Sequence, residues 1–266
     1  MPALNKQIMV QLAKQRFATL TSQPAVRKTA PTVGRALPLT PTPSLTRSSI
    51  TLGAARVANV DLSTTIEPIC HAICQAHEVW RPQASVVDVV INGPVASLGK
   101  IVGPDLAPSI RTFLSASPQA APAGEAGNAI AAGLGEAWTA YMASFSVPGL
   151  PWYPTFAAVP SPMAPPTPNV TTPLAAMTCR ASLISPSSLQ QAMARHLGNK
   201  SAPPQSEQLF DAIATGFHMA VTTWVAAQPV SNVMGKGPVP SFAPPYVPVG
   251  PVVHGDTLKT PGHLAA

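Results

Sequence analysis

Ala212–Trp224, AIATGFHMAVTTW, is a pattern that occurs in outline twice more in the chain. The other copies are PICHAICQAHEVW at Pro68–Trp80 and AIAAGLGEAWTAY at Ala129–Tyr141. Aligned without gaps, the copies agree in character at the second, fifth, sixth, ninth and thirteenth positions, which lie on one face of an α-helix. The small fifth and ninth positions allow another backbone to approach, while the aromatic thirteenth supplies buried area. The predicted packing residues are Ile69, Ala72, Ala76, Trp80, Ile130, Gly133, Ala137, Tyr141, Ile213, Gly216, Ala220 and Trp224.

The similarity continues beyond the helices. A valine follows each aromatic residue at the same spacing, at Val86, Val147 and Val230. The first and third copies then share a Gly-Pro-Val sequence, and the second and third share a later Val-Pro-Ser and Ala-Pro-Pro signature. Self-similarity of this kind indicates repeated packing units. It favours an internal triplication in which each helix leads into a strand and a Pro/Gly turn.

We therefore predict an α+β fold of three repeated helix-plus-β-hairpin units, with connecting helices and an extended N-terminal arm. The boundaries are set by the repeats and by composition. In order, the predicted segments are a basic helix and Pro-rich arm, unit one, unit two with a connecting helix, unit three and a C-terminal tail, at residues 1–62, 63–117, 118–204, 205–254 and 255–266.

Local signals place further elements along the chain. Ser63 is a candidate N-cap for the first repeat helix, with Glu67 in its first turn. Val86–Ile91 is the strongest strand signal, and Asn92-Gly93 follows as a turn pair, although Pro94 leaves a plain two-residue hairpin open. Helices are also expected at Leu4–Thr19, Asp105–Leu114 and, between Ser185 and Gly198, at Pro186–Leu197.

The composition points to surface that is buried in an assembly. Hydrophobic residues make up 46% of the chain and charged residues only 10%, so little polar surface is available to cover a monomer. The 33 prolines distinguish the chain from an ordinary soluble enzyme. The stretch Ala137–Cys179 has no charged side chain, but nine prolines between Pro148 and Pro173 interrupt any apolar helix. We expect no membrane span.

Basic residues are concentrated at the start of the chain, because every charged residue before Asp61 is positive. Such an arm commonly reaches an acidic partner, either nucleic acid or the acidic face of another subunit. A solvated, mobile terminus is the alternative. Phe17 is the only aromatic residue of the arm, which argues against base stacking. The predicted arm contacts are Lys6, Lys14, Arg16, Arg27, Lys28, Arg35, Arg47 and Arg56.

Candidate chemistry is sparse. Cys70, Cys74 and His77 share one helix face, and zinc accepts such donors. The other copies carry Ala, Gly, Trp or Val at most of these positions, so packing explains the cysteines better than a metal. The sequence has no Gly-x-Ser-x-Gly elbow, phosphate loop or dinucleotide fingerprint. We predict no catalytic residues, no metal and no cofactor, and therefore no enzyme activity.

The N-terminal sequence shows no secretory signal, since Lys6, Lys14 and Arg16 interrupt any apolar run. Three cysteines do not make a disulfide framework. Synthesis in the cytoplasm is therefore expected.

The repeated Ala/Gly-faced helix, followed by a Val-rich strand and a Pro/Gly turn, resembles small structural proteins of tailed phages and related contractile injection particles. The resemblance covers the three helices and residues 86–95, 147–170 and 230–253. It implies a virion structural protein of the tail, baseplate or neck, made in the host cytoplasm. Its implied partners are copies of itself and other virion proteins, contacted through the arm and the Pro-rich hairpins.

Two other functions are compatible with these features. The first is a capsid decoration or lining protein whose basic arm meets the shell or DNA, although nucleic acid is not the favoured partner. The second is a cellular binding module or envelope-associated adaptor. A ring-like or collar-like arrangement would suit a triplicated chain, because three similar units imitate a trimer and two chains present six near-equivalent sites.

Overall fold

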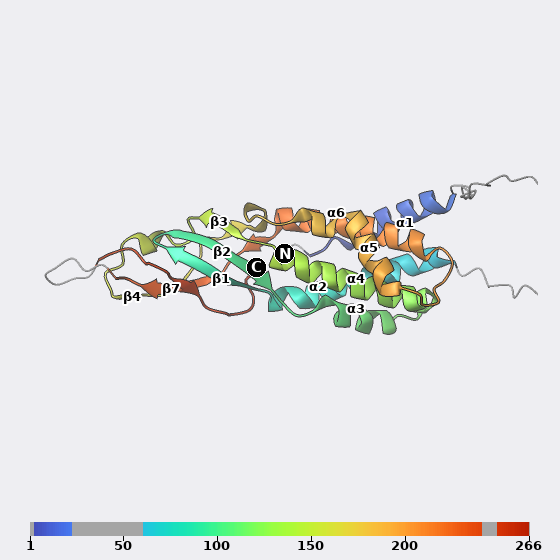
Figure 1. Cartoon of the computed structure of the whole chain (residues 1–266), viewed down its shortest axis with the longest axis horizontal. Coiled ribbons are helices and arrows are strands. Elements are labelled where there is room, and N and C mark those ends of the chain that lie inside the picture. Colours follow the sequence, from blue (N-terminus) through green and yellow to red (C-terminus); the bar gives the residue numbers. More distant parts are fainter. Residues whose placement is uncertain (1–2, 23–60, 241–248, 266) are drawn as a thin grey trace, which may run out of the picture.

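A computed structural model describes residues 3–22, 61–240 and 249–265. The molecule is long, with its α-helices gathered in one half and its strands in the other, as Figure 1 shows. This arrangement confirms the predicted α+β class. The described residues form six α-helices, which are α1 (Lys6–Ser22), α2 (Ile66–Trp80), α3 (Leu106–Ser115), α4 (Gly124–Ala143), α5 (Pro186–Leu197) and α6 (Ser206–Ala227).

The three copies of the sequence pattern lie in α2, α4 and α6, which we call the repeat helices. All twelve predicted packing residues are buried. The valine after each aromatic is also buried, at Val86, Val147 and Val230. The helical stripe is therefore confirmed in every copy, while descent of the three units from one ancestor stays a prediction.

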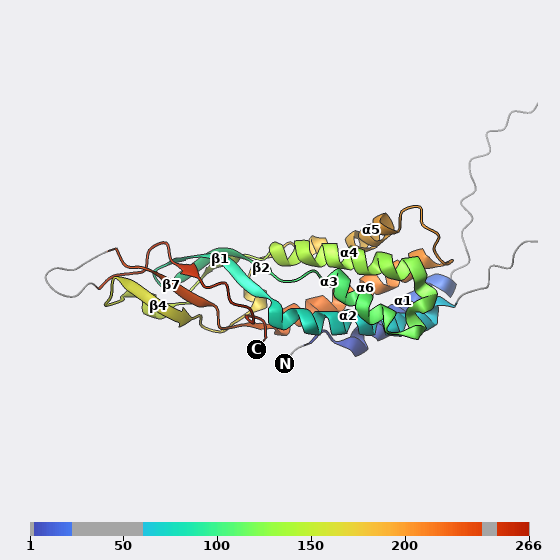
Figure 2. The same ribbon diagram turned by 90° about the horizontal axis from the view of Figure 1, so that it is seen from below.

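The other three helices, α1, α3 and α5, pack in the grooves between the repeat helices and are called the outer helices. α3 contacts both α2 and α4, α5 contacts both α4 and α6, and α1 contacts both α6 and α2. Figure 2 shows α3 between α2 and α4, with α5 on the other side of α4. The helical half therefore alternates repeat and outer helices around one axis, in a pseudo-three-fold arrangement.

Burial separates the two kinds of helix. The repeat helices α2, α4 and α6 bury nine, twelve and eleven residues, whereas each outer helix buries three. An outer helix thus contributes one apolar stripe to its groove and leaves its other faces to solvent. Each outer helix also begins with a side-chain cap, because Asn5, Asp105 and Ser185 accept hydrogen bonds from backbone N–H groups of the first turn.

The strand half is built from short strands with many prolines. The strands are β1 (Ser85–Asn92), β2 (Val95–Val102), β3 (Val147–Leu150), β4 (Met163–Pro168), β5 (Thr172–Pro173), β6 (Pro229–Val230), β7 (Met234–Pro238) and β8 (Asp256–Thr257). They form antiparallel sheets in the orders β1-β2-β3, β4-β7-β8 and β5-β6. Prolines cannot donate to a ladder, which keeps the pairings of β4 and β5 short.

The first unit contains the predicted hairpin. β1 pairs with β2 in the register Asn92↔Val95, so Gly93 and Pro94 form a two-residue loop. Gly93 has φ +55°, as the first central position of a type II′ turn requires. The prediction of a separate hairpin in each unit is wrong for units two and three. Their strands pair with each other, β4 with β7 and β5 with β6, and so tie the units together.

Two local predictions need correction. The N-cap at the start of unit one is Asp61 rather than Ser63, because a 3-10 helix (Leu62–Thr65) precedes α2 and the Asp61 carboxylate accepts from the Ser63 N–H. The segment predicted as a C-terminal tail instead packs into the body. His263 and Leu264 are buried, and the Val86 N–H donates to His263 Nδ1 at 2.8 Å.

Candidate functional site

In α4 and α6, the fifth position of the repeat pattern is a glycine that lies directly against the backbone of a neighbouring outer helix. A Cβ placed on Gly133 would lie 2.7 Å from the backbone nitrogen of Met193 in α5. A Cβ on Gly216 would lie 2.7 Å from the carbonyl oxygen of Met9 in α1. Real Cβ atoms do not approach backbone so closely, so both contacts require glycine. The relation of α4 to α5 is thus repeated between α6 and α1.

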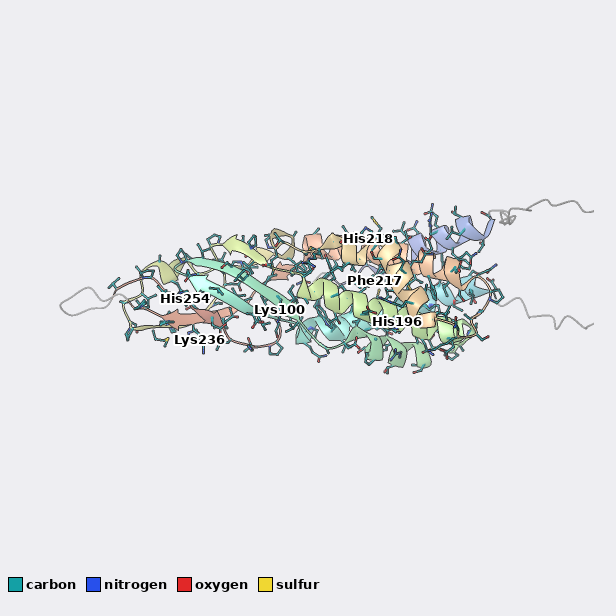
Figure 3. The ribbon with its side chains drawn as sticks, in the orientation of Figure 1. Lys100, His196, Phe217, His218, Lys236 and His254 are labelled. Atoms are coloured by element: carbon teal, nitrogen blue, oxygen red, sulfur yellow. The ribbon has the colours of Figure 1, made fainter. Side chains whose placement is uncertain are left out.

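The seventh position faces the beginning of the preceding outer helix. Gly135 lies against Ala107 and Asp105 at the start of α3. In α6 the equivalent His218 lies within hydrogen-bond distance of the Ile184 carbonyl, 3.0 Å away, just before α5; Figure 3 labels this histidine in the helical half. In α4 and α6, residues at the fifth and seventh positions of the pattern therefore lie against the structure on either side of the helix.

The tenth and thirteenth positions meet where the repeat helices converge. His77 of α2 lies edge-on to Trp138 of α4 and to Trp224 of α6, with ring centroids 5.4 and 4.7 Å apart. Trp138 also contacts Trp80 at 5.0 Å. Val221, at the tenth position of α6, is fully buried. The predicted role of Trp80 and Trp224 as core anchors is confirmed, and the centre of the helical half is an aromatic cluster.

The candidate metal face is part of this packing. Burial lowers the pKa of His77 to about 3, with the Arg81 charge adding to the shift, and its two ring nitrogens have no hydrogen-bond partner among the described residues. Burial raises the pKa of the Cys74 thiol to about 11, and Glu78 adds to that shift. The pKa of Cys70 is also raised by burial. Thiols in this state are poor nucleophiles and ligands.

The described ranges contain neither a cluster of metal-ligating side chains nor a helix suited to cross a membrane. These residues contain no group of three or more His, Cys, Asp or Glu side chains that could hold a metal ion. None of the helices described here combines the length and the apolar character that a membrane crossing requires.

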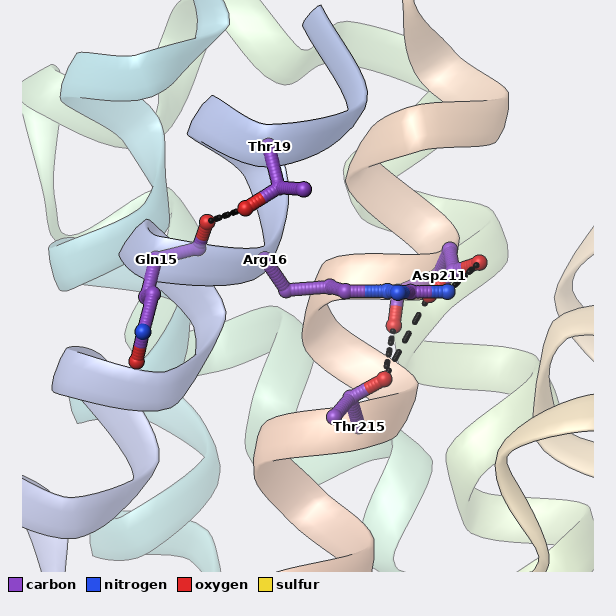
Figure 4. Close-up of polar contacts among 5 residues, drawn as sticks. All are labelled: Gln15, Arg16, Thr19, Asp211 and Thr215. Atoms are coloured by element: carbon purple, nitrogen blue, oxygen red, sulfur yellow. Dashed lines mark hydrogen bonds and ion pairs between the residues drawn. The ribbon is translucent and has the colours of Figure 1, made fainter.

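Two basic residues of α1, Lys14 and Arg16, form ion pairs with acidic residues of the same chain. Lys14 Nζ lies 2.7 Å from Glu67 Oε2 of α2, and Arg16 Nε lies 2.8 Å from Asp211 Oδ1 of α6. Figure 4 shows the Arg16 contact bridging α1 and α6, with Thr215 donating to the same carboxylate. The Lys14 ammonium lowers the pKa of Glu67, chiefly through their hydrogen bond. Lys14 and Arg16, predicted to contact a partner, therefore contact the body of their own chain.

These contacts define a groove between α6 and α2 that α1 occupies. We call it the α1 groove. Its walls carry Gly216 and Asp211 on the α6 side and Glu67 on the α2 side. The apolar stripe of α1 that fills it consists of Met9, Ala13 and Phe17.

A pocket of about 610 Å³ opens at the end of the α1 groove where the chain leaves α1. Phe17 and Thr21 of α1 line it on one side, and Asp61 and Ile66 line it on the other. Of the other predicted arm contacts, Lys6 is exposed at the start of α1, and the remaining five lie outside the described residues, at Arg27, Lys28, Arg35, Arg47 and Arg56.

The sequence predicted the basic side of the α1 contacts and missed the acidic side. Glu67 and Asp211 carry no motif, and only their position on the repeat helices makes them partners of α1. A signal was nevertheless present. The three outer helices each begin with a capping residue and each precede a copy of the pattern, as members of a repeated unit would.

Comparison of the chain with protein-family models, with curated proteins and with solved structures finds no match. The geometry of the chain itself therefore carries the assignment of function.

Proposed function

We propose that the chain is a non-enzymatic virion structural protein of a tailed phage or a related contractile injection particle. It would sit on a symmetry axis of the tail, baseplate or neck. The observation that carries this proposal is the pseudo-three-fold arrangement of α2, α4 and α6 with their outer helices. A chain with three similar faces can contact three equivalent neighbours around one axis.

The chemistry of the core supports a structural role. Cys70, Cys74 and His77, which share one face of α2, are buried at packing positions. His77 is held neutral within the aromatic cluster, and the pKa values of Cys70 and Cys74 are raised by burial. Catalytic groups more often have a pKa near the working pH and access to a substrate.

The test is the location of the chain in purified particles. Cells that encode the chain would be induced, and particles separated on a density gradient and probed with an antibody against the chain in electron micrographs. We expect label at one level on the particle axis, retained after a high-salt wash. Particles from a strain lacking the gene are the control. Chain found only in the particle-free fractions would contradict the proposal.

A capsid-lining role with DNA as partner is the second candidate, and the charge distribution favours it over the cellular adaptor. Residues 23–60 carry five basic side chains and no acidic one, whereas the rest of the chain carries eleven basic and ten acidic residues. Neutralising five phosphates of duplex DNA would give a plot of log K against log salt with a slope of about −4.5. A slope near zero would instead favour contact with protein.

A further inference from the structure

The connection between an outer helix and its repeat helix differs sharply in length among the three units. Eight residues link α3 to α4 (116–123), and eight link α5 to α6 (198–205). In unit one, residues 23–65 separate α1 from α2, which is forty-three residues. The connection from α1 to α2 is therefore thirty-five residues longer than the equivalent connections in the other two units.

The geometry at this step does not require the additional length. Thr21 near the end of α1 and Asp61 before α2 line the same pocket, so the two ends of the connection lie close together. By contrast, thirty-eight extended residues, the number from 23 to 60, can span roughly 130 Å. That reach exceeds the length of α1, about 26 Å, several-fold.

α1 is also separable from the body in a way that α3 and α5 are not. Short connections on both sides hold α3, because three residues join β2 to α3 and eight join α3 to α4. α1 instead attaches through one stripe of three buried side chains and two ion pairs at its borders. A helix of this length is marginal alone in water, so α1 needs a groove of this shape. An identical groove exists on every other copy.

We propose that α1 is exchanged between copies of this chain, so that α1 of one copy fills the α1 groove of the next. The occupant is a second copy of the same helix, with Met9, Ala13 and Phe17 in the groove and Lys14 and Arg16 on Glu67 and Asp211. α1 makes the same contacts in the groove of its own chain as in the groove of another copy. Only the path of residues 23–60 distinguishes the two arrangements. Exchange of this kind joins subunits without a new interface.

This inference deepens the proposed function and rests on it for its biological use, because an exchanged helix would link neighbouring subunits of a particle. Its test requires only the purified full chain. Failure of helix exchange would therefore leave a role in the virion open, and absence from virions would leave helix exchange open.

The experiment uses the Lys14–Glu67 ion pair as a reporter. Unlabelled and ¹⁵N-labelled full chains would be mixed in denaturant, refolded together and treated with a carbodiimide that joins an amine directly to a carboxylate. Mass spectrometry then distinguishes mixed-isotope from same-isotope cross-links. The control is the Lys100–Asp88 pair inside the β1–β2 hairpin, which has similar exposure and a distance of 2.9 Å against 2.7 Å. This control should give same-isotope links only.

If α1 is exchanged, about half of the Lys14–Glu67 cross-links in an equal mixture should be mixed. A variant in which three residues replace 23–60 restores an eight-residue connection and should give same-isotope Lys14–Glu67 links only. Exclusively same-isotope Lys14–Glu67 links in the full chain would overturn the proposal, whether the protein is a monomer or associates through another surface. Mixed links that persist unchanged in the shortened variant would overturn the role of the connection.

Discussion

Trp224 joins α6 to the aromatic cluster and to the end of its own helix. Its ring lies against His77 and Trp138, and its Nε1–H donates to Gln228 Oε1 at 3.0 Å. Trp224→Ala should lower the free energy of unfolding by about 3–5 kcal/mol, because it opens a cavity and removes the N–H donor to Gln228 Oε1. Urea unfolding followed by far-UV circular dichroism measures this. A loss well below 1 kcal/mol would show that the ring is not a core anchor.

His77 gives the helical half a stability that depends on pH. Its folded pKa of about 3 lies below the ordinary value near 6.5, so the unfolded chain takes up the proton first as the pH falls. Stability is therefore present above pH 6.5 and is lost as the pH falls toward 3. Between pH 7 and pH 4.5 we expect a loss of about 2–3 kcal/mol through this group.

His77→Leu should remove this contribution, so that the change in unfolding free energy between the two pH values becomes smaller by that amount. The matched control is His71→Leu, on the exposed face of the same helix, which should keep the pH dependence of the unchanged protein. Urea titrations at pH 7 and pH 4.5 give the comparison. Equal pH dependence in all three proteins would mean that His77 is protonated in the folded state.

At the scale of elements, the approach of α4 to α5 depends on Gly133. Gly133→Ala places a Cβ 2.7 Å from backbone of α5, so the two helices must separate, at a cost of about 1–3 kcal/mol. Gly127→Ala on the same helix is the control. Its nearest new contact is Ala123 Cβ at 3.5 Å, so it should stabilise by about 0.5–1 kcal/mol through helix propensity. Thermal unfolding of both variants should shift in opposite directions. Shifts of the same sign would reject Gly133 as a packing requirement.

The helices could be predicted from the sequence more fully than the strand half. The stripe of each repeat helix repeats within one turn or two, so its local periodicity identifies both the element and its buried face. The start of α5 at Ser185-Pro186 could be predicted from equally local residues. Strand pairing between units two and three involves β4 and β7, which are more than sixty residues apart, and no local pattern specifies that register.

Only part of the candidate site could be predicted, again because local patterns are visible in the sequence and long-range contacts are not. Lys14 and Arg16 stand out because no acidic residue precedes Asp61, whereas their partners Glu67 and Asp211 are ordinary residues of longer helices. The packing of α1 on α6 joins nearly opposite ends of the chain, and charge counts alone suggested an arm that points away. The α3–α4 and α5–α6 connections are both eight residues long. This equality becomes visible only when each outer helix is aligned together with the repeat helix that follows it.

At the scale of the whole molecule, exposed apolar side chains lie mainly in the strand half. Most of the large hydrophobic residues exposed in the described ranges belong to it, namely Val95, Leu98, Val102, Met163, Val170 and Val249. In the same half, a pocket of about 390 Å³ is lined by Met163, Pro165 and Pro238, beside Lys236 and His254, which Figure 3 labels. Few charges cover this surface, because only 10% of the chain is charged. Contact with neighbouring subunits would remove it from water.

The pseudo-three-fold helices and this apolar surface together lead to a prediction about mass. We expect the purified full chain to form closed oligomers at micromolar concentration, because symmetric closure buries the same surface on every copy. Analytical ultracentrifugation across a concentration series should give a discrete species larger than the 27.4 kDa chain rather than a continuous ladder. Leu98→Lys, on the exposed face of β2, should weaken the association, whereas Val79→Lys on α2 is a control outside the strand half. A stable monomer throughout the series would contradict burial of this surface by self-association.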